Sequence, residues 1–177
     1  MKRWALLLVA MVFVAISASG QGFGFLVHGP AKIVGTFHAQ DIANDYKDVS
    51  PAVWAYTSGM IYLDTHRFPY FLTTKDRDTL VSLLQQSAHY CQVAKANATT
   101  VDYTKDVGEF VTEDGARVVV KFVTHGWEHC GIEIWAFNGG RNMALHLTTR
   151  DVNDLVQALS AVSDSVADYN RQVGFFN

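Results

Sequence analysis

Leu72-Thr73-Thr74-Lys75-Asp76 and Leu147-Thr148-Thr149-Arg150-Asp151 are two copies of one pattern, and they decide how we expect this chain to fold. In each copy a strand-like stretch ends at the leucine. A following threonine can accept a hydrogen bond from the first free amides of a helix, and the aspartate adds negative charge to the first helical turn. Leucine and valine then recur every three or four residues, as in an amphipathic helix. Each copy therefore predicts a strand that leads into a helix.

Extended segments surround the two predicted helices. The first helix is expected to run to about Ala96, and the second to end at Gly174. Hairpin-type turns are expected at residues 113–115 and 138–141, where glycine and asparagine tolerate positive φ. We therefore expect an α+β domain over residues 32–177, an antiparallel sheet of about six to seven strands with two amphipathic helices on one face. The expected strands are 32–39, 52–63, 68–72, 103–112, 116–125, 131–138 and 142–149, and a loop or short helical turn is expected over 40–51.

The similarity of the two halves has two explanations. A hairpin-plus-helix unit was duplicated, or two strand-to-helix junctions converged on ordinary capping residues. The sequence leaves both open.

The first 20 residues have the pattern of a secretory signal peptide. Lys2 and Arg3 precede an apolar run from Trp4 to Ile16, and small residues follow before Gln21. The apolar run is shorter than the roughly 20 residues that cross a bilayer, although an uncleaved anchor stays an alternative. We expect a secreted or periplasmic protein with a flexible leader over residues 21–31 and no membrane span after cleavage.

Charge and glycine pattern limit the classes of partner and cofactor. The formal charge is −3, and loss of Lys2 and Arg3 with the expected signal peptide makes it −5. A negative domain is a poor partner for nucleic acid or anionic lipid. The glycine clusters at residues 22–24 and 139–140 do not form a phosphate-binding loop, and no Gly-x-Ser-x-Gly elbow is present. We therefore expect no cofactor and no nucleic acid.

The two cysteines, Cys91 and Cys130, are expected to form a disulfide in an oxidising compartment. Cys91 shares one face of the first helix with Leu84, and Cys130 shares one side of a strand with Ile132. The alternative is two buried free thiols.

The segment from His125 to Cys130 concentrates the side chains that could bind a metal. His125 and His129 could ligate zinc if the fold supplied a third ligand such as His146 or His89. The segment is expected to be a hairpin loop, where the helical His-x-x-x-His geometry is missing, so a polar turn is the alternative.

Aromatic residues exceed what one sheet face needs. Most should pack in the core, but Trp54, Tyr56, Tyr70 and Trp127 are candidates for an exposed surface that binds a protein, peptide or glycan. Asn97-Ala98-Thr99 fits the N-glycosylation pattern, which applies in a eukaryotic host.

We therefore expect a small exported domain that acts as a non-catalytic binding or accessory module. One alternative is a metal-dependent hydrolase centred on His125 and His129. Another is a structural subunit that assembles through a sheet edge.

Overall fold

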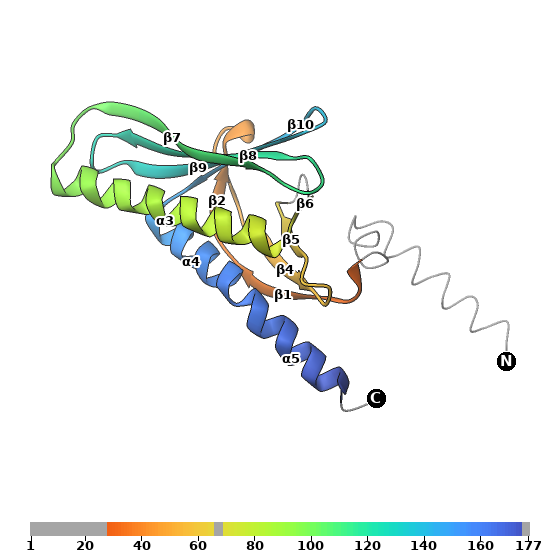
Figure 1. Cartoon of the computed structure of the whole chain (residues 1–177). Helices are drawn as coiled ribbons and strands as arrows, with labels where there is room; N and C mark the ends of the chain where they lie inside the picture. Colours follow the sequence, from red (N-terminus) through yellow and green to blue (C-terminus); the bar gives the residue numbers. More distant parts are fainter. Residues whose placement is uncertain (1–27, 66–68, 175–177) are drawn as a thin grey trace.

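Two antiparallel sheets and two long helical segments make up the fold, which a computed structural model describes for residues 28–65 and 69–174 (Figure 1). The helices are η1 (Ile42–Asn44), α3 (Thr74–Ala96), α4 (Thr149–Ser160) and α5 (Val162–Gly174). The strands are β1 (Ala31–Thr36), β2 (Ala39–Asp41), β3 (Lys47–Val49), β4 (Ala52–Tyr56), β5 (Ile61–Asp64), β6 (Pro69–Leu72), β7 (Asp102–Val111), β8 (Arg117–His125), β9 (Cys130–Asn138) and β10 (Arg141–Leu147).

The predicted α+β class is confirmed, and the predicted single sheet is divided in two. One sheet has the strand order β1-β4-β5-β6, and the other has the order β3-β2-β10-β9-β8-β7. The segment 52–63, which was expected to be one strand, is two strands of the four-stranded sheet. It is the β4–β5 hairpin, and Gly59 occupies its turn with a φ of 86°. The alternation of side chains continues across this turn, so the reversal leaves little trace in the sequence.

Both helices begin where the repeated pattern predicts. Thr73 accepts a hydrogen bond from the Asp76 amide at 3.2 Å, and the Thr73 amide donates to the Asp76 carboxylate at 2.9 Å. Thr148 and Asp151 form the same capping box at the start of α4. The second helix is not continuous, because it breaks at Ala161 into α4 and α5.

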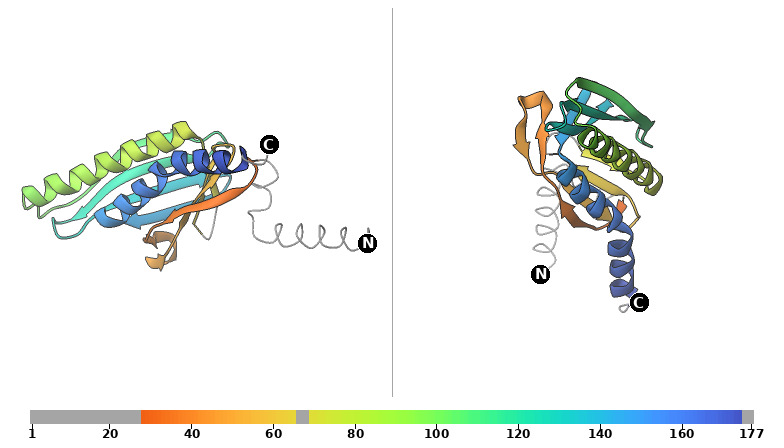
Figure 2. Two further views of the ribbon diagram at one scale, coloured as in Figure 1. Left: turned by 90° about the horizontal axis from the view of Figure 1, so that it is seen from below. Right: turned by 90° about the vertical axis from the view of Figure 1, so that its left-hand side faces the viewer.

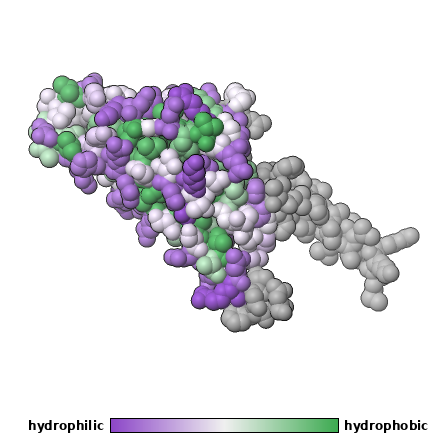
Figure 3. Space-filling view, in the orientation of Figure 1, coloured by the Kyte–Doolittle hydropathy of each residue, from purple (hydrophilic) through white to green (hydrophobic). Residues whose placement is uncertain are grey.

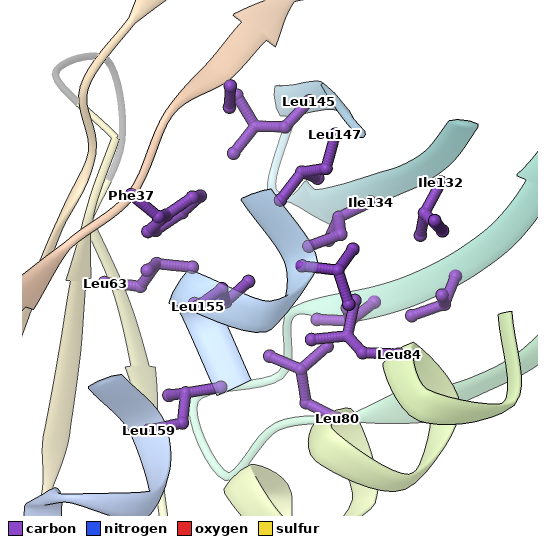
Figure 4. Packing of buried hydrophobic residues seen from close by; sticks show 14 of the residues in the cluster. Phe37, Leu63, Leu80, Leu84, Ile132, Ile134, Leu145, Leu147, Leu155 and Leu159 are labelled. Carbon is purple, nitrogen blue, oxygen red and sulfur yellow. The ribbon is translucent and has the colours of Figure 1, made fainter. Parts of the chain in front are cut away.

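The helices bury their apolar stripes between the two sheets. Figure 2 shows α3 and α4 on the same side of the six-stranded sheet, and α4 also contacts β1 and β4 of the other sheet. Gly35 permits that approach, since a Cβ at this position would lie 2.7 Å from the Cβ of Ala158. In the core, Leu155 lies between side chains of the four-stranded sheet and those of α3 (Figure 4).

Within the ranges 28–65 and 69–174, no helix is both long and apolar enough to cross a membrane. The predicted signal peptide and most of the predicted leader lie outside the described residues, as do residues 66–68 of the β5–β6 connection. The strand β1 begins at Ala31, the last residue assigned to the leader.

Candidate functional site

The four aromatic residues predicted to bind a ligand lie in three separate places. Trp54 and Tyr56 are on β4, on the face of the four-stranded sheet opposite Val53 and Ala55, and Tyr56 is only 2% exposed. Tyr70 is on the core face, where its hydroxyl donates to the Ala136 carbonyl of the other sheet at 3.2 Å. Trp127 is in the β8–β9 turn and is 41% exposed. The four residues therefore do not form one surface, and Trp127 is the exposed member.

The histidine loop is an open turn. His125 and His129 are both exposed, and the Nδ1 atom of His125 lies 3.4 Å from the Asp102 carboxylate. Among the residues that the structure describes, no three histidine, cysteine, aspartate or glutamate side chains gather as metal ligands would. His125 and His129 therefore have no third metal ligand beside them among the described residues.

The predicted disulfide is absent, because both cysteines are free thiols. Burial, and after it the neighbouring Cys130, raise the pKa of Cys91 to about 12. The two side chains are therefore neighbours, as their faces predicted. The Cys130 sulfur lies within its own turn, 3.6 Å from the Thr124 hydroxyl and 3.7 Å from the Trp127 carbonyl. The two thiols thus meet as hydrogen-bonding neighbours and are not joined by a covalent bond.

A different surface forms where α3 ends. The Asn97 side chain donates to the Val93 carbonyl at 2.8 Å, and Ala98 turns the chain with a φ of 45°. The Thr99 carbonyl then accepts a hydrogen bond from the Trp127 amide at 2.6 Å. The α3–β7 connection is thereby fixed to the β8–β9 turn, and the two loops form one end of the molecule.

A pocket of about 220 Å³ opens at this end, between α3 and the strands β7 and β8. We call it the α3–β7 groove. Most of its wall is apolar or aromatic, and Lys105 contributes a cation. The lining residues are Tyr90, Val93, Ala94, Thr99, Val101, Tyr103, Lys105, Phe122 and Thr124.

Lys105 is the charged group of the groove. Its ammonium donates to the Tyr90 hydroxyl at 2.9 Å and lies 4.3 Å from the centre of the Tyr90 ring. The hydrogen bond from Lys105 lowers the pKa of Tyr90, and the same bond raises the pKa of Lys105. The groove therefore combines a positive charge with apolar walls.

Exposed apolar side chains concentrate around the groove. The described residues include seven exposed large apolar side chains; three of them line the groove, and a fourth, Trp127, is in the β8–β9 turn bonded to Thr99. Figure 3 shows separate hydrophobic residues among polar ones at this end of the molecule, where α3 ends in Figure 1. The four are Val93 (43% exposed), Val101 (61%), Tyr103 (53%) and Trp127 (41%).

A second pocket, of about 240 Å³, lies between α5 and the strands β1 and β4. Its wall includes Tyr56, Val166 and Tyr169. None of the exposed large apolar side chains of the described chain lines it. We therefore take the α3–β7 groove as the candidate site.

A row of polar residues crosses the outer face of the six-stranded sheet. Glu133 pairs in register with Lys121 on one side and with His146 on the other, and it accepts a hydrogen bond from the Trp135 indole at 2.7 Å. Glu133 is thus partly exposed to water and also has a hydrogen-bond partner. The whole row, strand by strand, is Asp106, Lys121, Glu133, His146, Gln40 and Asp48.

Comparisons with known proteins yield no relative: no family model, no curated protein and no solved structure matches this chain.

Sequence reasoning found one residue of this end, Trp127, and missed the residues of the groove itself. A signal was present in Val93, which lies off the buried stripe of α3 among polar neighbours. Val101 and Tyr103 gave a second signal, since they are apolar residues next to a loop. These residues can be recognised as one site only in the fold, which brings α3, β7 and β8 together.

Proposed function

We propose that this chain is an exported, non-catalytic binding module and that it holds a polypeptide partner in the α3–β7 groove. The observation that supports the proposal is that three of the seven exposed large apolar side chains of the described residues line one pocket and that a fourth, Trp127, lies in the adjoining turn. Apolar residues that gather on a surface are typical of interaction sites. Protein interfaces also rely on a few apolar or aromatic anchors that fill pockets.

The size of the groove favours one side chain of a larger partner. A pocket that encloses a whole small ligand usually measures about 300 to 1,000 Å³, whereas this one measures about 220 Å³. The exposed Trp127, in the adjoining β8–β9 turn, adds apolar surface next to the pocket. One side chain of the partner in the groove, with the partner's neighbouring residues against Trp127, accounts for both features.

The export part of the proposal comes from residues 1–20. A charged start, a short apolar run and small residues before Gln21 are the features that secretion machinery recognises. Mass spectrometry of the protein recovered outside the cytoplasm tests whether the chain is exported and cleaved. We expect it to begin at Gln21, and recovery of the intact chain in the cytoplasm would contradict export.

Site-specific photo-crosslinking tests the binding proposal. We would place a benzophenone side chain at Tyr103 in the full chain, in the cells that produce it, and irradiate them. The control position is Val111, which lies on the same strand and is 65% exposed. We expect a discrete polypeptide adduct from position 103 and none from position 111.

A pair of matched variants connects that adduct to the groove. Val93→Asp places a charge in the groove wall and should abolish the adduct, whereas Gln92→Asp adds the same charge at the exposed neighbouring position and should leave it intact. A glycan adduct would contradict a polypeptide partner. An adduct of twice the chain's mass would favour assembly of this chain with itself through a sheet edge. Equal crosslinking from both positions would show that the groove is not selective.

A further inference from the structure

The strand β7 is both a wall of the α3–β7 groove and an edge of the six-stranded sheet. It pairs with β8 on one side and is the last strand in the sheet order. An edge strand presents backbone N–H and C=O groups that can pair with another extended chain. β7 is long for an edge strand, since it has 10 residues.

A bulge divides β7 into two parts. The register with β8 shifts between Asp106 and Gly108, and bulges limit pairing along an edge. The regular part, from Asp102 to Asp106, is the part beside the groove. Tyr103 and Lys105 line the pocket from this part, whereas Asp102 and Asp106 lie on the opposite face near His125 and Lys121.

From this arrangement we infer that the partner is an extended segment that adds to β7 as an antiparallel strand and carries charges complementary to those of β7. The inference rests on the proposed function and specifies the partner's chemistry. Directly opposite residues in an antiparallel pair share a face. The partner residue opposite Lys105 is therefore acidic, and the residue opposite Tyr103 is a large apolar residue that enters the groove. Residues opposite Asp102 and Asp106 are basic.

Written from its amino end, the segment has the order basic, acidic, any residue, large apolar, basic. The acidic and apolar residues are two positions apart, so both point to the groove face of the added strand. The two basic residues point to the outer face, where the β7 carboxylates lie. Charge complementarity of this kind selects register and partner.

A synthetic peptide tests the inference. The probe is Gly-Ser-Lys-Glu-Thr-Phe-Lys-Ser-Gly with a fluorescent label, titrated with the full chain as the cell processes it and followed by fluorescence anisotropy. The control peptide has the core Lys-Glu-Phe-Thr-Lys, in which the phenylalanine moves by one position, so that glutamate and phenylalanine lie on opposite faces of the added strand in every register. We expect the probe to bind at least about tenfold more tightly than the control peptide.

A charge exchange provides the second readout. Lys105→Glu should weaken binding of the probe by about tenfold or more, and a peptide with lysine in place of its glutamate should restore binding to this variant. Lys95→Glu makes the same change at an exposed residue outside the groove and should alter affinity by less than about twofold. Lys105→Ala serves as a milder variant, and its loss of affinity should be smaller.

The outcomes separate the inference from the proposed function. No binding of the probe up to ~1 mM, equal binding of both peptides, or no restoration by the exchanged charge would overturn the extended-segment inference. A polypeptide adduct from position 103 would then still support the proposed function. Absence of any such adduct would overturn the proposed function itself.

Discussion

His146 shows at the scale of one residue how closely the outer face of the six-stranded sheet is packed. Its ring lies against Gly131, where a Cβ would overlap the imidazole. The Nδ1 atom is buried and has no hydrogen-bond partner among the residues that the structure describes. Burial is the largest influence on this residue and lowers its pKa from 6.5, while the nearby Glu133 and Asp151 oppose the shift. Neutral imidazole is therefore the form that the folded state favours.

We predict a pH dependence of stability from this shift. The unfolded chain binds a proton at His146 more readily than the folded chain does, so the free energy of unfolding should fall as the pH drops from 6.5 through the lowered folded-state pKa. His146→Gln should remove this part of the loss. Chemical denaturation at a series of pH values measures it, with His89→Gln at the exposed helix surface as control. Identical pH profiles for the wild type and His146→Gln would contradict the prediction.

At the scale of one element, the capping boxes allow a matched comparison. Thr73 caps α3 through its hydroxyl, whereas the adjacent Thr74 is the first residue of the helix and is exposed. Thr73→Ala should lower the free energy of unfolding by about 1 kcal/mol, and Thr74→Ala should change it by less than about 0.5 kcal/mol. Urea denaturation of both variants tests this. A larger loss from Thr74→Ala would show that the cap was assigned to the wrong threonine.

The elements were largely predictable because their signals are local. The helix starts follow from threonine and aspartate at capping spacing, and the turns of the last four strands follow from glycines, of which Gly115, Gly139 and Gly140 all have positive φ. The break at Ala161 gives no such signal, since no proline or glycine marks it. The β2–β3 hairpin was also missed, because its strands have three residues each and a polar composition.

At the scale of the whole molecule, pairing between distant segments determines what the sequence could not show. The two sheets contact each other through Tyr70 and Ala136, which are 66 residues apart in the chain. The groove likewise joins residues of α3, β7 and β8, none of which is distinctive alone. Trp127 was predicted as a binding residue from its aromatic character. The exposed apolar residues of the groove near it could be identified only from the fold.

The central claim is that an extended polypeptide binds along β7 beside the α3–β7 groove. Amide hydrogen exchange of the full chain, with and without the partner captured at position 103, tests it most directly. New backbone hydrogen bonds should slow exchange in the segment from Asp102 to Asp106, because an added strand protects the free edge. The opposite edge of the same sheet, β3 (Lys47–Val49), should exchange at an unchanged rate. Unchanged exchange in β7, or protection that appears in β3 instead, would contradict the claim.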